Sequence, residues 1–176
     1  AYAFALERTE GPTVLVLTRQ NVGHPEGCSR EGLYKGGYTI RPQTNPSIVL
    51  VASGSEVGLC LSVADKLESA AVVSMPIMEV YHEQSVAYKR SLFPKGVPVM
   101  SVEAASVSSW SGIAHVSHGM SGFGASAPAN KLFETFGFTV DNLVNKAQKT
   151  IEFYKQAGGA PDLVDRPVFE VSSAGH

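Results

Sequence analysis

The stretch IVLVASGSEVGLCLSVADKL, Ile48 to Leu67, contains the signal of a buried strand followed directly by the signal of a helix. Its first five residues are all apolar, which is typical of a parallel strand covered on both faces. Ser53 and Glu56 have the spacing of a capping box, which predicts where the helix begins. The apolar residues of the second half share one side of that helix: Val57, Cys60, Leu61, Ala64 and Leu67. The stretch therefore predicts a βα unit of a sheet with helices on both faces.

The rest of the chain continues this alternation of strand and helix. Further apolar runs occupy residues 14–17, 70–73 and 97–102, the last interrupted by Pro98 and Ser101. A longer helix is predicted from about Asp141 to Tyr154, with an acidic first turn and a basic last turn that suit the helix dipole. Elements in this order predict an α/β fold, a three-layer αβα sandwich in which a mostly parallel sheet lies between helices.

The composition has no extreme that would indicate a nucleic-acid or membrane partner. The 176 residues carry 14 Lys and Arg against 16 Asp and Glu, so no basic face is available for a phosphate backbone or an anionic lipid. The longest apolar runs are far short of a membrane span, and the N-terminus does not have the pattern of a signal peptide. Cys28 and Cys60 lack metal spacing. We interpret them as reduced thiols of an intracellular, cytoplasmic protein rather than as a disulfide.

The chain is expected to contain parts of two domains. AYAFALER, at the N-terminus, resembles a helix entered midway, so the chain looks like part of a longer polypeptide. Residues 22–35 are rich in glycine and polar residues, and a loop of this length inside one compact domain would be unusual. We therefore predict that residues 1–22 are the last helix and strand of an upstream domain. Residues 23–36 would be a linker, 37–157 the main domain, and 158–176 an irregular tail.

Arg19 is the first candidate for a functional residue. It follows the apolar run in VLVLTRQN, Val14 to Asn21, and would lie at the carboxyl end of a parallel strand, where open α/β sheets collect their ligands. A guanidinium at that place could hold a phosphate or a carboxylate by two hydrogen bonds. The alternative is a structural ion pair with an acidic residue of the linker, such as Glu26.

Three further sequence patterns are weaker candidates for a functional site. SGSEV, Ser53 to Val57, could attract an anion at a strand-turn-helix junction, but a helix cap is the better interpretation. His115 and His118 could meet on one helical face, yet no third metal ligand is evident. The segment from Gly122 to Phe138 joins small residues to four phenylalanines, which are interpreted first as core and second as a dimer contact. These phenylalanines are Phe123, Phe133, Phe136 and Phe138. On these grounds alone the function stays undecided.

Several segments, taken in order, resemble the C-terminal signature series of the transketolase family over roughly residues 12 to 156. They are LTRQN followed by PEG, then KGGY, NPSIVLVASGSEV, VVSMP, SVEA, and FGASAP with FETFGFTVDNL. The resemblance implies a parent enzyme of the pentose phosphate pathway, which moves a two-carbon ketol unit from a ketose phosphate to an aldose phosphate. It also implies thiamine diphosphate with Mg or Ca as cofactors. The parent would have three domains and work as a homodimer.

The resemblance also implies a place for each part of this chain. Residues 1–22 would end the middle, pyrimidine-binding domain, and the third domain would contain a five-stranded mixed sheet whose first strand, near Gly37 to Arg41, is antiparallel. The arginine of the S/T-R-Q-N motif, which contacts the substrate phosphate in relatives, is Arg19 here. The catalytic, cofactor-binding and metal-binding residues of the family all belong to upstream segments. We therefore expect none of them in this chain, and we expect the chain to be inactive alone.

The sequence departs from the family pattern at two places, and two alternative functions stay open. The link between Leu67 and Val72 is shorter than in typical relatives, and Ser121 and Gly122 stand where relatives commonly carry an Asp-Arg pair. One alternative function is an interaction module that supports a dimer or binds a regulatory ligand. The other is the C-terminal part of a related thiamine enzyme such as dihydroxyacetone synthase.

Overall fold

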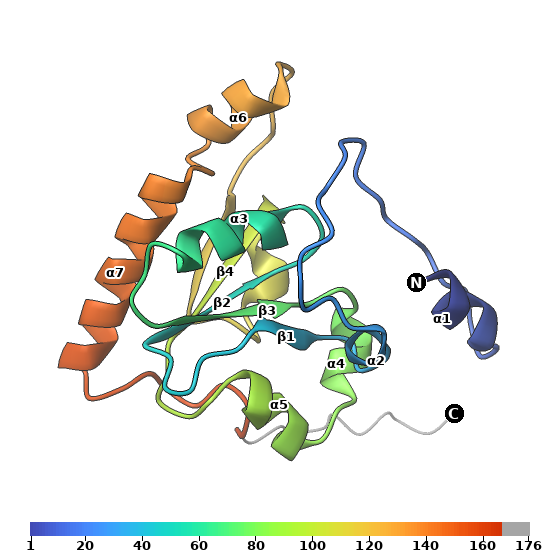
Figure 1. Ribbon diagram of the computed structural model, residues 1–176, viewed down its shortest axis with the longest axis horizontal. Coiled ribbons are helices and arrows are strands. Elements are labelled where there is room, and N and C mark those ends of the chain that lie inside the picture. Colours follow the sequence, from blue (N-terminus) through green and yellow to red (C-terminus); the bar gives the residue numbers. More distant parts are fainter. Residues whose placement is uncertain (167–176) are drawn as a thin grey trace, which may run out of the picture.

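A five-stranded sheet forms the centre of the computed structural model, which describes residues 1–166 (Figure 1). The strands are β1 (Tyr38–Arg41), β2 (Ile48–Ala52), β3 (Ala70–Ser74), β4 (Val99–Ser106) and β5 (Val116–Met120). They lie in the order β1-β3-β2-β4-β5. β1 runs antiparallel to β3, whereas the other three pairs are parallel. The expected mixed, mostly parallel sheet with an antiparallel first strand is confirmed.

Helices cover both faces of this sheet. The helices of the described residues are α1 (Tyr2–Glu7), α2 (Arg30–Tyr34), α3 (Glu56–Ala64), α4 (Met78–His82), α5 (Val86–Leu92), α6 (Ala129–Thr135) and α7 (Val140–Gln156), with a short 3₁₀ helix η1 (Val107–Trp110). α3 and α7 supply buried residues to the core on one face, and α4, α5 and η1 supply those on the other. The three-layer αβα sandwich predicted from the sequence is therefore confirmed.

The two cores explain why β2 is apolar at every position. Ile48, Leu50 and Ala52 contact the core beneath α3 and α7, while Val49 and Val51 contact the core on the opposite face. Successive side chains of a strand point to opposite faces, so an alternating polar pattern would place polar groups in one of the two cores. All five residues are 0 % exposed.

Both predicted helices form, although α3 ends at Ala64 and so does not include Leu67. α3 follows β2 directly, and the helix predicted from about Asp141 to Tyr154 is α7, with Leu143 and Ala147 buried against the sheet. Its N-terminus is capped by Thr139, whose hydroxyl accepts a hydrogen bond from the Asn142 N–H at 3.4 Å. Asp141 in the first turn and Lys155 in the last turn complement the helix dipole.

The apolar run at residues 14–17 does not form the buried strand that was predicted. Val14, Val16 and Leu17 are 81 %, 91 % and 71 % exposed, and the run has no strand beside it in residues 1–166. A strand needs a neighbour to receive its backbone N–H and C=O groups, and an apolar pattern alone does not supply one. Figure 1 shows the segment between α1 and α2 as a long irregular excursion beside the sheet.

The predicted linker and tail contain more structure than expected. The linker includes α2, which is capped by Ser29 Oγ accepting from the Gly32 N–H at 2.9 Å. α1 contacts α2 through an edge-to-face pair of Phe4 and Tyr34, with ring centroids 5.4 Å apart. In the tail, Ala160 forms a β-bridge with Gly96. Residues 167–176 of the predicted tail lie outside the described residues, and the domain boundaries themselves stay predictions.

Three smaller findings concern single residues and the membrane. Cys28 is an exposed free thiol and Cys60 a buried one, as interpreted from the sequence. Trp110 is 1 % exposed and packs in the core between the sheet, α4 and α5. Among the helices of residues 1–166, none has the length and the apolar character that a membrane crossing requires.

The sheet order creates a switch point between β2 and β4. From β2 the chain passes through α3 to β3 on one side, whereas β4 lies on the other side and leads on to β5. In open α/β sheets, ligands bind beyond the carboxyl ends of the strands at such a point. A ligand site is therefore expected among the residues that follow β2, β4 and β5.

Candidate functional site

Arg19 lies in the irregular excursion between α1 and α2. The residue is exposed, and none of the ion pairs formed by the described residues involves it, so the alternative pairing with Glu26 is not seen. Next to it, the Thr18 hydroxyl donates a hydrogen bond to the backbone carbonyl of Gln20 at 3.1 Å. The structure thus leaves Arg19 exposed to solvent, in an irregular segment and not at the end of one of the five strands.

The switch point is occupied by two acidic side chains from different elements. Glu103, on β4, accepts hydrogen bonds from the Ser53 hydroxyl at 2.8 Å and from the Ser53 N–H at 3.2 Å. Glu56, at the start of α3, is only 4 % exposed and accepts from the Ser55 hydroxyl at 3.2 Å. Burial raises the pKa of both carboxyl groups, and the nearby Glu103 charge raises the pKa of Glu56 further.

This arrangement corrects two interpretations of SGSEV. The capping box is wrong, because the Ser53 hydroxyl binds Glu103, and the N-cap residue is Ser55, which makes no side-chain cap bond. The anion site is also disfavoured, because a carboxylate of the protein already accepts from the Ser53 N–H. Sequence reasoning missed Glu103. The available signal was the first charged residue after the apolar run of β4, at the edge where ligands collect.

The two histidines serve structural contacts rather than a metal. His115 Nδ1 accepts from the Val99 N–H at 2.9 Å, and its Nε2 lies 2.8 Å from the Pro161 carbonyl, to which it donates. His118 Nδ1 lies 2.7 Å from Lys146 Nζ, which donates to it. His118 is in β5 rather than in a helix, and residues three apart in an extended chain point to opposite faces. The described residues hold no group of three metal-ligating side chains.

His118 is held in its neutral form. It is 6 % exposed, and its ring packs against Phe138 with centroids 4.4 Å apart. Burial lowers the pKa of His118, and the neighbouring Lys146 charge lowers it further, while the backbone carbonyls of Phe136 and Gly137 partly offset this. The Lys146 hydrogen bond uses the lone pair of Nδ1, which places the ring proton on Nε2.

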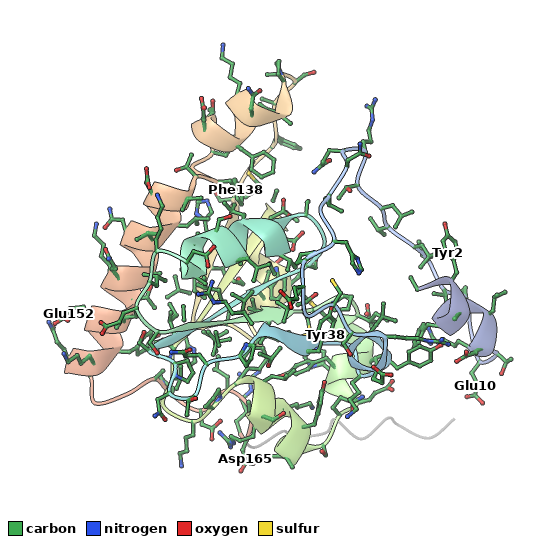
Figure 2. All side chains as sticks on the ribbon, viewed as in Figure 1. Tyr2, Glu10, Tyr38, Phe138, Glu152 and Asp165 are labelled. Carbon is green, nitrogen blue, oxygen red and sulfur yellow. The ribbon has the colours of Figure 1, made fainter. Side chains whose placement is uncertain are left out.

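An apolar groove of about 360 Å³ lies between the carboxyl ends of β4 and β5 and helix α6. Its walls include Ala104, Ala105, Met120, Phe133, Phe136 and Phe138. Phe138, labelled at the junction of α6 and α7 in Figure 2, is 5 % exposed, so it is core as expected. Phe133 and Phe136 are half-buried. Phe123 is fully exposed, so the interpretation of all four rings as core is wrong for this one.

The sequence and the fold are similar to those of transketolases. Residues 36–139 match the family described as "Transketolase-like TK C-terminal domain". Transketolase 1 of Candida albicans is 42 % identical over 159 residues, which cover 88 % of this chain and 24 % of the relative. Transketolase 1 of Escherichia coli (strain K12) is 39 % identical over 162 residues, covering 86 % of this chain and 24 % of the relative.

A solved structure of the transketolase from Leishmania mexicana superimposes with a TM-score of 0.88 at 41 % identity, covering 92 % of this chain and 24 % of that one. The chain therefore spans about a quarter of the length of the relatives it matches. The family match covers more than half of the chain, and the likeness extends to sequence and fold alike. This chain belongs to the transketolase family.

Proposed function

We propose that this chain is the C-terminal part of a transketolase that transfers a two-carbon ketol unit from a ketose phosphate to an aldose phosphate. The observation that carries the proposal is the likeness to transketolases over 88 % of the chain, which includes the family's C-terminal domain. A similar structure from Pichia stipitis, 43 % identical with a TM-score of 0.85, is described as a complex with sedoheptulose 7-phosphate. This supports a phosphorylated sugar as the substrate class.

Within that reaction, Arg19 is proposed to bind the substrate phosphate. Its guanidinium keeps its charge at any physiological pH and offers a planar fork that matches two phosphate oxygens. It is exposed, with no ion pair among the described residues, so the side chain is available to an anionic ligand. Arg19 would hold and orient the substrate and would take no part in bond making or breaking.

The described residues do not fit thiamine diphosphate or its metal ion. They contain no group of three side chains that could hold a metal. The switch point, where a diphosphate would meet free amides in other α/β sheets, contains the carboxyl groups of Glu56 and Glu103. We therefore propose that the cofactor is bound by other parts of the parent, that the parent is a homodimer, and that this chain alone is inactive.

Kinetics of Arg19→Ala in the full-length parent test this role. We expect the KM for xylulose 5-phosphate to rise and kcat/KM to fall by about 10- to 150-fold, the equivalent of roughly 1.5–3 kcal/mol for a lost charged hydrogen bond. An unphosphorylated ketose donor is the internal control, because it has no phosphate to lose and its kcat/KM should stay the same. Unchanged kinetics with xylulose 5-phosphate would show that Arg19 does not bind the phosphate.

Two other functions fit parts of the observations. The uncharged groove beside Phe123 favours an additional role as an interaction module. A related thiamine-dependent ketol transferase, such as dihydroxyacetone synthase, would share this architecture. Acceptor assays on the full-length parent would distinguish the two enzymes.

We propose the cytoplasm as the compartment, because both cysteines are free thiols.

A further inference from the structure

The chain after α7 folds back across the amino ends of β4 and β5 as a strap, defined here as residues 159–166. A Schellman motif ends α7 just before it. The Gly158 N–H donates to the Lys155 carbonyl at 3.3 Å. The Gly159 N–H donates to the Tyr154 carbonyl at 2.8 Å. Both glycines have a positive φ, of 81° and 121°, which residues with a side chain rarely adopt. This glycine pair is therefore the hinge at which the strap leaves the helix.

Hydrogen bonds hold the strap to the loops that lead into β4 and β5. The Ala160 N–H donates to the Gly96 carbonyl, ahead of β4, at 3.0 Å. Nε2 of His115, ahead of β5, donates to the Pro161 carbonyl at 2.8 Å. Nδ1 of the same ring accepts from the N–H of Val99, the first residue of β4, at 2.9 Å. The strap is thus fixed at the opposite end of these strands from the switch point.

An ion pair attaches the strap to α5. Arg90, in the last turn of α5, lies 2.7 Å from a carboxylate oxygen of Asp162 and 3.9 Å from one of Asp165, which Figure 2 labels. The side chains of Arg90 and Asp162 are 28 % and 20 % exposed. Figure 1 shows the strap running from the end of α7 to α5. Because these helices cover opposite faces of the sheet, the strap connects the two helical layers.

The strap buries little apolar surface for a segment with so many polar contacts. Within residues 159–166 only Ala160 is buried, while Leu163 and Val164 are half-buried. Val164 packs against the core on the α5 face. Segments with few buried apolar contacts open at a lower free energy than core strands, and closing the strap also costs backbone entropy. Polar contacts must therefore supply much of what keeps it closed.

We propose that the strap opens and closes as a unit of its own, about the glycine hinge, and that the Arg90 ion pair keeps it closed. Opening separates α5 from the end of α7, while β4 and β5 keep their own pairing. A partly exposed ion pair is weakened when salt screens its charges. The strap is thus a closure that responds to ionic strength. It uses neither Arg19 nor a substrate nor a second chain, so it is independent of the proposed function.

Native-state amide hydrogen exchange of the 176-residue chain tests whether the strap opens by itself. The Ala160 amide reports on opening, because its acceptor Gly96 lies outside the strap. The Leu50 amide, in the centre of β2, reports on unfolding of the sheet. After correction for intrinsic rates, Ala160 should exchange at least about tenfold faster than Leu50. Its opening should also depend less steeply on urea, because it exposes less surface. Equal protection and equal urea dependence would show that the strap unfolds only with the sheet, which would overturn the proposal.

Two arginine variants test the ion pair. Arg90→Gln removes the charge that faces Asp162 and should raise the exchange rate of Ala160 at least about fivefold. Arg41→Gln is the matched control, because Arg41, in β1 at the other edge of the sheet, is 36 % exposed and pairs with Asp65. It should leave the Ala160 rate unchanged. A similar rise in both variants, or none in Arg90→Gln, would contradict the role of Arg90.

A salt titration separates the charge of Arg90 from its packing. Between about 0.05 and 1 M NaCl the Debye length falls from above 10 Å to about 3 Å. The wild-type Ala160 amide should then exchange at least about threefold faster, relative to a peptide of residues 157–166 measured at each salt concentration. In Arg90→Gln the same titration should leave the rate flat. If that variant did not fold, the wild-type titration alone would decide, because a rate that is flat in salt refutes a closure held by charge.

Discussion

At the scale of single residues, the structure shows polar groups held by partners that are distant in the sequence. Glu103 accepts hydrogen bonds from the Ser53 N–H and hydroxyl across 50 residues, and Lys146 donates to His118 Nδ1 across 28 residues. The first pair joins β4 to the turn that follows β2, and the second pair joins β5 to α7. Because burial shifts the pKa values of Glu103 and His118, the protonation states of these two groups are linked to the free energy of unfolding.

His118 gives a pH dependence with a definite sign. The pKa of His118 is lowered in the folded chain, whereas an unfolded histidine has a pKa of about 6.5. Below about pH 6.5 the unfolded chain binds the proton first, so the contribution of His118 to the free energy of unfolding falls as the pH falls toward the folded pKa. Above about pH 6.5 this contribution is complete and constant.

Urea denaturation of the wild type and of His118→Asn between about pH 5 and 8 measures this effect. Asparagine can accept from Lys146 and does not titrate, so the difference in unfolding free energy between the two proteins should grow in favour of the variant as the pH falls. Glu56 and Glu103 have raised pKa values and act in the opposite sense, but they are present in both proteins and cancel in the difference. A difference that is flat across this range would contradict the account of His118.

At the scale of elements, an apolar run becomes a strand only where the chain supplies neighbours for it. β2 and the run at residues 14–17 have the same apolar character in the sequence. β2 has β3 on one side, β4 on the other and a core on each face, whereas the earlier run has none of these in the described residues. The hydrophobic effect stabilises a residue only when the fold removes it from water.

Two leucines provide a matched comparison of these runs. Leu50→Ala should lower the free energy of unfolding of the 176-residue chain by about 2–5 kcal/mol, because Leu50 is 0 % exposed and its loss leaves a cavity. Leu17→Ala should change it by less than about 0.5 kcal/mol, because Leu17 is 71 % exposed. Chemical denaturation of both variants checks the pair. Similar losses would mean that Leu17 is buried in solution.

The sequence correctly predicted those elements whose packing partners all lie within the same domain. β2, α3 and α7 were predicted because their apolar periodicity matches the core that they share. The capping role of Ser53 was wrong because Glu103, distant in the sequence, competes for its hydroxyl. Periodicity also could not separate Phe138 from Phe123, because burial depends on where the chain turns after β5. Arg19 became a candidate because it follows an apolar run that was predicted to be a strand, and the family resemblance added the substrate phosphate as its ligand. The structure shows no strand at that run and leaves Arg19 exposed.

At the scale of the whole molecule, the chain combines a complete αβα sandwich with a segment that lacks a neighbour. The sandwich buries its own strands on both faces, while three of the four apolar side chains at residues 14–17 are exposed. Such an exposed run has the properties of an unpaired strand, whose backbone groups and side chains would be satisfied by joining another sheet. In the proposed parent, the middle domain would provide that sheet, next to the substrate that Arg19 would hold.

Amide hydrogen exchange can therefore test the predicted membership of residues 1–22 in the middle domain. In the 176-residue chain the amides of residues 14–17 should exchange as fast as those of an open loop, because no strand pairs with them. In the full-length parent the same amides should exchange at least about 100-fold more slowly, since a paired strand opens only rarely. The amide of Leu50, in the centre of β2, is the internal control and should be protected in both proteins. If residues 14–17 exchanged fast in the parent as well, the segment would not be a middle-domain strand, and Arg19 would lose the rigid support that its proposed role requires.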